Sequence, residues 1–155
     1  MRRCLIVMCL LGITYGLHAQ QKEPVSWQYT VKHLGGRKAE LHLTALLEKG
    51  WHLYSQHQPE GAIATPTRIE FSKNPILALG GPVKEIGRLE KYTVRELNVV
   101  HHQYEGTVDF VQSITLKTKA KTVIKGTVRY QVCTDEMCMP EELAAFAVEI
   151  PATVK

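Results

Sequence analysis

Apolar and polar residues alternate along most of this chain. Val25, Trp27, Tyr29 and Val31 are separated by polar residues, and every second residue from Ala39 to Leu47 is apolar. A period of two places apolar side chains on one face of an extended strand and polar ones on the other. Since this pattern recurs along the chain and no sustained 3.6-residue stripe competes with it, we predict half-buried antiparallel β-strands.

Seven or more short strands joined by glycine-containing turns are typical of a two-sheet antiparallel sandwich. The sequence therefore predicts an all-β fold. The expected strands are Val25–Val31, Ala39–Leu47, Thr67–Phe71, Val83–Tyr92, Thr107–Leu116, Val123–Cys133 and Phe146–Ile150. The expected turns are Gly35-Gly36, Gly80-Gly81-Pro82 and Glu105-Gly106. Pro140–Ala145 has a proline start and early acids, as helices do, but Pro151 follows so soon that we expect a turn leading into an edge strand.

The first residues have the features of an export signal. Arg2 and Arg3 precede an apolar run from Leu5 to Leu17, and a small residue, Ala19, precedes a polar stretch. The run is shorter than the roughly 20 residues that a bilayer span needs. We therefore predict a signal peptide at 1–19 and a single exported domain at 20–155, with no membrane association after cleavage.

The charge of the chain argues against a nucleic-acid partner. The net charge of +4 falls to about +2 when Arg2 and Arg3 leave, and lysines are interspersed with acids in Val83–Lys91. Nucleic-acid-binding domains usually carry a clustered basic face and a higher isoelectric point. We expect a monomer that does not bind nucleic acid.

Cys133 and Cys138 are the two cysteines that remain after the predicted cleavage. Strand alternation along Ile124–Cys133 places Cys133 on the polar side, so we expect it at or near the surface. Four intervening residues suit a tight hairpin, in which the two cysteines come close enough for a reversible disulfide.

Three roles for these cysteines stay open on the residues alone. A purely structural disulfide closing so short a ring stabilises by roughly 2 kcal/mol, against about 4.7 kcal/mol for a hundred-residue loop, so redox exchange is favoured. A secreted binding module with a structural hairpin disulfide is the alternative. Zinc is the least favoured, because no defined cysteine and histidine spacing supports it. The six histidines beyond the leader are His33, His42, His52, His57, His101 and His102.

Two segments resemble a known family. Tyr130-Gln131-Val132-Cys133 to Cys138-Met139-Pro140 is similar to the active-site hairpin of the amino-terminal periplasmic domain of the thiol:disulfide interchange protein DsbD. Lys49-Gly50-Trp51-His52-Leu53-Tyr54-Ser55 resembles that family's Gly-aromatic-x-Leu-Tyr segment. The resemblance implies an immunoglobulin-like sandwich in the periplasm. It also implies a protein-disulfide reductase or interchange component, without a cofactor or metal, that relays electrons between thioredoxin-like donors and acceptors.

The resemblance also implies roles for single residues. Cys138 matches the cysteine that forms mixed disulfides with partners, and Cys133 matches its resolving mate. Tyr54 and His52 stand where the family places aromatics beside the disulfide. A cap loop over the thiols is expected within Tyr92–His101, with Glu96 as its acidic residue and Leu97 in place of a shielding aromatic.

The chain departs from the family pattern in three ways. Its cysteines are one residue closer together, and Pro140 is followed by Glu141 instead of a second proline. No transmembrane conduit or thioredoxin domain follows Lys155, so we expect a stand-alone domain that receives electrons from a separate protein. Asp135 and Glu136 disfavour a nearby thiolate, which predicts an ordinary or raised cysteine pKa.

Overall fold

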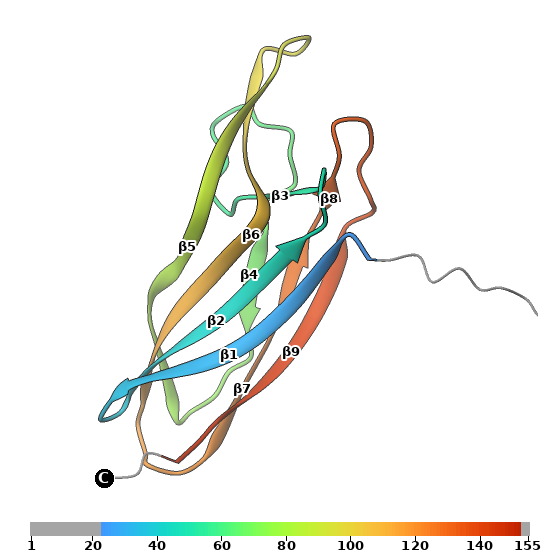
Figure 1. Cartoon of the computed structure of the whole chain (residues 1–155). Helices are drawn as coiled ribbons and strands as arrows, with labels where there is room; N and C mark the ends of the chain where they lie inside the picture. Colours follow the sequence, from blue (N-terminus) through green and yellow to red (C-terminus); the bar gives the residue numbers. More distant parts are fainter. Residues whose placement is uncertain (1–22, 153–155) are drawn as a thin grey trace, which may run out of the picture.

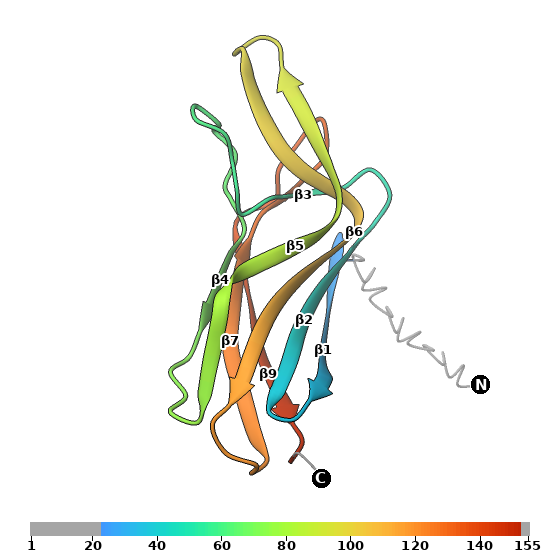
Figure 2. The same cartoon turned by 90° about the vertical axis from the view of Figure 1, so that its left-hand side faces the viewer.

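A computed structural model describes residues 23–152, which form nine β-strands in two antiparallel sheets (Figures 1 and 2). The predicted leader lies outside the described residues. Within them, no helix is long and apolar enough to cross a bilayer. The strands are β1 (Val25–Gly35), β2 (Lys38–Leu47), β3 (His52–Tyr54), β4 (Arg68–Phe71), β5 (Leu77–Val94), β6 (Val99–Leu116), β7 (Thr122–Tyr130), β8 (Val132–Cys133) and β9 (Glu142–Ile150).

The larger sheet is organised by the long strand β6. Its second half pairs with β2, its first half pairs with β3, and β5 follows it along the opposite edge. The path therefore runs β1-β2-β6-β3-β8, with β5 beside β6. Since β3 and β8 lie at one end of this sheet, the hairpin that follows β8 projects from that end, together with the tip of the β5–β6 hairpin (Figure 1).

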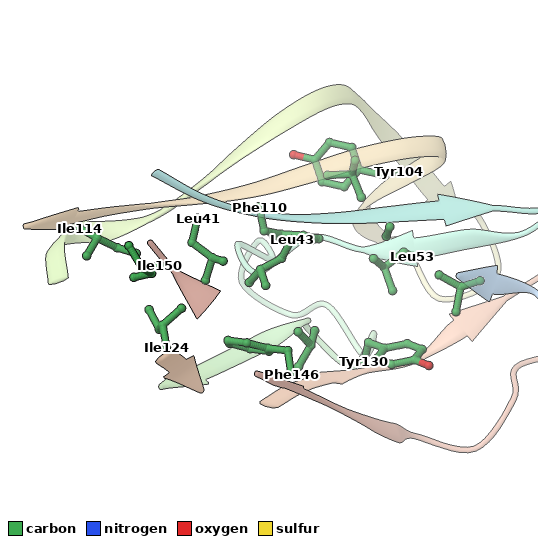
Figure 3. Packing of buried hydrophobic residues seen from close by; sticks show 14 of the residues in the cluster. Leu41, Leu43, Leu53, Tyr104, Phe110, Ile114, Ile124, Tyr130, Phe146 and Ile150 are labelled. Carbon is green, nitrogen blue, oxygen red and sulfur yellow. The ribbon is translucent and has the colours of Figure 1, made fainter. Parts of the chain in front are cut away.

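The smaller sheet has the order β4-β7-β9, and its inner face packs on the larger sheet. Figure 3 shows side chains of both sheets meeting in the core, including Leu43 and Phe110 from the large sheet and Ile124 and Phe146 from the small one. Phe110 is fully buried. The predicted immunoglobulin-like sandwich is confirmed.

The Gly35-Gly36 turn is confirmed, and both glycines have positive φ angles of 102° and 57°. The other two predicted turns are wrong. At Gly80-Gly81-Pro82 the chain continues within β5 through a bulge, and at Glu105-Gly106 it continues within β6 through a second bulge. A glycine with positive φ serves a strand bulge as well as a turn, so the residue type alone did not separate the two.

The remaining strand boundaries differ mainly in length. β9 begins at Glu142, so most of the segment expected to form a turn already belongs to an edge strand. β3 was not predicted, because three residues are too few to reveal a period of two. The predicted strand Val123–Cys133 is divided: β7 stays in the small sheet, and β8 joins the large one.

Candidate functional site

A disulfide joins Cys133 and Cys138 across the hairpin that follows β8. Two backbone hydrogen bonds flank the pair: Thr134 N–H donates to the Met137 carbonyl at 2.7 Å, and Met139 N–H donates to the Val132 carbonyl at 2.9 Å. The cysteines therefore occupy a non-hydrogen-bonded antiparallel position, where facing Cα atoms come closest. Their Cα atoms are 4.0 Å apart. The predicted hairpin disulfide is present.

The loop between the cysteines is held by Thr134. Its hydroxyl oxygen accepts hydrogen bonds from the backbone N–H groups of Glu136 at 3.2 Å and Met137 at 3.1 Å. These bonds give the backbone N–H groups of the turn hydrogen-bond acceptors within the turn itself. It leaves the side chains of Asp135, Glu136 and Met137 exposed.

The two cysteines differ sharply in exposure. Cys138 is exposed, whereas Cys133 is 1% exposed, so the prediction that Cys133 lies at or near the surface is wrong. The alternation of β7 does not continue to Cys133, because β7 ends at Tyr130 and β8 pairs with β3 in the other sheet. Solvent therefore reaches Cys138 and is largely excluded from Cys133.

Two buried histidines and a buried tyrosine lie beside the disulfide. His52 on β3 is the cross-strand neighbour of Cys133 and is 5% exposed. The His52 ring meets Tyr54 edge to face at 5.3 Å between centroids, and the Tyr54 ring meets His101 of β6 in the same way at 5.5 Å. These side chains form an aromatic surface on the outer face of the sheet, next to the cysteines.

This surface and the two hairpins enclose an open pocket of about 460 Å³. It brings together four of the predicted site residues, Cys138, His52, Tyr54 and Glu96. Leu97 does not line it and is 57% exposed at the tip of the β5–β6 hairpin. The pocket is lined by His52, Tyr54, Tyr92, Val94, Glu96, His101, Thr134, Asp135, Glu136, Met137 and Cys138.

Sequence reasoning missed the contributions of Tyr92, Val94, His101 and Met137 to this pocket. Tyr92, Val94 and Glu96 are spaced by two residues, so period-two alternation through the expected cap could have assigned them to one face. Tyr92 is the register partner of His101 on β6. No pattern in the sequence indicated that Met137 lines the pocket.

A carboxylate network holds the chain that follows β3. Glu85 of β5 accepts hydrogen bonds from the Ser55 hydroxyl at 2.7 Å, from the Gln56 backbone N–H at 2.6 Å and from the Tyr104 hydroxyl at 2.8 Å. The Thr67 hydroxyl donates to the Tyr54 carbonyl at 2.6 Å. These bonds position the end of β3, and with it His52 and Tyr54.

The electrostatics of the pocket keep its histidines neutral. Burial lowers the pKa of His52; Asp135 and Glu90 oppose this shift, and His101 adds to it. Burial also lowers the pKa of His101 and raises that of Tyr54. Arg129, the nearest basic residue along the chain to the cysteines, forms an ion pair with Glu141 at 2.9 Å.

We expect the fold to lose stability as the pH falls below about 6.5, the ordinary histidine pKa. Above that value His52 and His101 are neutral in both states. Below it the unfolded chain takes up protons first, because the folded pKa values are lower, and stability declines until the pH reaches them. Urea unfolding at pH 7.5 and 5.5 measures this. The double variant H52F/H101F should lose less stability between these pH values, and an equal loss in both proteins would contradict the assignment.

The fold and the hairpin define a class of protein: a β-sandwich domain of the thiol:disulfide interchange type. The family model described as "Thiol:disulfide interchange protein DsbD, N-terminal" matches residues 19–150. The chain belongs to that family. A comparison with curated proteins finds no match.

One solved structure supports the fold, and two others have lower similarity. The N-terminal periplasmic domain of ScsB from Proteus mirabilis is similar with a TM-score of 0.53 and 17% identity, over 88% of this chain and 51% of that one. This chain thus spans about half the length of the ScsB structure. The reduced DsbD N-terminal domain of Neisseria meningitidis has a TM-score of 0.41 and 9% identity over 72% and 78% of the two chains. The yeast GGA1 GAE domain has a TM-score of 0.44 and 10% identity, over 84% of this chain and 96% of that one.

Proposed function

We propose that this chain is an exported thiol:disulfide exchange domain that cycles the Cys133–Cys138 disulfide with thioredoxin-like partners. The observation that carries the proposal is the difference in exposure within one hairpin, with Cys138 exposed and Cys133 buried. Domains of the DsbD type interact with thioredoxin-like proteins in thiol-disulfide relays. The donor and acceptor roles of such partners toward this chain are part of the proposal.

Because Cys138 is the exposed cysteine, it reacts with a partner before Cys133 does. A donor thiolate attacks the Cys138 sulfur, a mixed disulfide forms, and Cys133 leaves with the electron pair of the broken bond. A second thiol of the donor then releases reduced Cys138. In the acceptor half-reaction Cys138 attacks the disulfide of the acceptor, and Cys133 resolves the resulting mixed disulfide.

The neighbouring residues have supporting roles in this proposal. Tyr54 and His52 line the pocket together with Cys138, and Glu96 adds an acidic side chain to it. Leu97 is a candidate contact for an incoming partner because it is exposed at the hairpin tip. The proposal also includes a monomeric, periplasmic domain at residues 20–155, after removal of a signal peptide at 1–19.

The reduction potential of the cysteine pair tests this function. Purified protein is equilibrated in graded thiol buffers, and alkylated cysteines are counted by mass. We expect a value of roughly −180 to −270 mV, the range of exchange proteins, because the disulfide is accessible through Cys138. A value below about −300 mV would indicate a structural disulfide and favour a secreted binding module instead.

A further inference from the structure

A buried histidine stands beside the buried cysteine. His52 and Cys133 are directly paired on neighbouring antiparallel strands, where Cβ atoms are roughly 4.5 to 5.5 Å apart. They are 5% and 1% exposed. The family resemblance places an aromatic residue at this position, so an ionisable ring is a property of this chain that packing against the disulfide does not require.

Disulfide exchange requires a proton acceptor near Cys133 but not near Cys138. Each time the disulfide closes, Cys133 must lose a proton, and each time it opens, Cys133 must gain one. A thiol buried to this degree has little direct access to water, and burial disfavours its thiolate. Cys138 is exposed and can exchange protons with solvent.

We propose that His52 accepts the proton of the Cys133 thiol when Cys133 closes the disulfide, and returns it when the disulfide opens. This inference rests on the proposed exchange function. In either tautomer the neutral ring has one nitrogen free to accept a proton.

The closing step balances as follows. The Cys133 S–H bond breaks, and its proton moves to the His52 ring. The Cys133 sulfur forms a bond with the Cys138 sulfur, the bond between Cys138 and the partner breaks, and the electron pair leaves with the partner's sulfur. Over the attack by Cys138 and this closing step together, the two protein thiols are oxidised to a disulfide and the partner disulfide is reduced to two thiols.

The surroundings of His52 suit a proton acceptor. Its pKa is lowered by burial, so the ring is neutral and ready to accept at pH 7. His52 also lines the open pocket, which gives an accepted proton a route to solvent. The titratable groups that face it are Asp135 from the hairpin, Glu90 of β5, His101 and Glu105 of β6, and Tyr54 of its own strand, whose hydroxyl lies 3.5 Å from His52 Nε2.

The test separates the closing step from the first attack. Reduced protein is mixed with oxidised glutathione, quenched in acid at set times and analysed by mass, so that the Cys138–glutathione adduct and the closed disulfide are counted separately. In His52→Phe the adduct should form at the wild-type rate but close about 10-fold or more slowly at pH 7, since general-base catalysis contributes at least that much.

The pH profile gives a readout that altered packing would not imitate. Closure in the wild-type protein should vary little between pH 7 and 8, because His52 stays neutral. In His52→Phe it should rise about tenfold per pH unit, because it then follows the thiolate fraction of Cys133. His52→Gln, which keeps a polar side chain but accepts no proton at these pH values, should behave like His52→Phe.

His42→Phe is the control, since it replaces a half-buried histidine of β2 that does not line the pocket. It should close at the wild-type rate. Closure in His52→Phe at the wild-type rate, or with the wild-type pH profile, would overturn this inference alone. Equal slowing in His42→Phe would also overturn it, by assigning the effect to a general loss of packing. A wild-type protein that forms no Cys138 adduct would instead contradict the proposed function.

Discussion

Cys133→Ser is expected to trap a stable mixed disulfide with a thiol partner, whereas Cys138→Ser is expected to form almost none. The reason is the position of the two sulfurs. Cys138 is exposed beside the pocket, while Cys133 is 1% exposed under the hairpin. Reactivity toward a disulfide requires both a thiolate and access to it.

The two variants can be compared with oxidised glutathione and with the disulfide dimer of a thioredoxin that retains only its first active-site cysteine. Adducts are resolved on non-reducing gels and identified by mass. We expect more than about tenfold faster adduct formation by Cys133→Ser at pH 7.5, because only that variant keeps the accessible thiol. The adduct should persist, because no second thiol is left to release the partner.

Each variant serves as the stability control of the other. Both lose the same disulfide, which closes a short ring and contributes roughly 2 kcal/mol, so their free energies of unfolding should fall by similar amounts. A difference in adduct formation then reports exposure and not folding. Equal rates in the two folded variants would mean that the hairpin opens readily enough to expose Cys133, and would remove the basis for a fixed order of attack.

The sequence predicted the parts of the site that depend on local pattern. A ring closed by four residues between Cys133 and Cys138 requires a tight hairpin, and the doublet Gly35-Gly36 requires a turn between two alternating strands. The pairing of β1 with β2 and the disulfide follow from these features. Both involve residues that are neighbours along the chain, so no long-range contact had to be inferred.

The sequence could not predict which sheet each segment joins. Alternation along β7 was extended to Cys133, but the chain passes from the small sheet to the large one between Tyr130 and Val132. Cys133 is therefore buried beside His52 instead of following the polar face of Arg129. Such a transfer depends on long-range pairing with β3. That strand is too short to show an alternating pattern in the sequence.

The cap illustrates the same limit. A loop was expected over the thiols, but Tyr92–His101 forms the end of a long hairpin whose turn has its backbone hydrogen bonds from Leu97 to Val94 and from Asn98 to Arg95. Glu96 reaches the pocket and Leu97 does not. Which of two adjacent side chains faces the disulfide depends on the twist and register of β5 against β6, which two bulges alter.

Gly126→Ala is expected to destabilise the domain by about 3 kcal/mol, at the upper end of the range for overpacked cores. Gly126 lies in β7 at the centre of the small sheet, with Phe71 and Phe146 as its register partners. A methyl group there would overlap the backbone oxygen of Glu70 and the ring of Phe146. A backbone oxygen cannot rotate away as a flexible side chain can, so the strands themselves must separate.

The Phe146 ring spreads this effect beyond its own sheet. It packs edge to face on Phe71 at 5.8 Å between centroids and also contacts Tyr29 of β1 in the opposite sheet at 5.5 Å. Displacing the ring therefore loosens the contact between the two layers as well as the small sheet. Since Gly126 does not line the pocket of the disulfide, the folded fraction of Gly126→Ala should keep the wild-type reduction potential.

Urea unfolding of three glycine variants measures the effect against matched controls. Gly87→Ala and Gly80→Ala place a methyl group 3.1 and 3.3 Å from the nearest atoms, so small shifts suffice and each should cost less than about 1 kcal/mol. The expected order of lost stability is thus Gly126, then Gly87, then Gly80. If Gly126→Ala unfolds at the same urea concentration as Gly80→Ala, the small sheet accommodates a methyl group at Gly126. The prediction that close packing of β4, β7 and β9 requires glycine there would then be wrong.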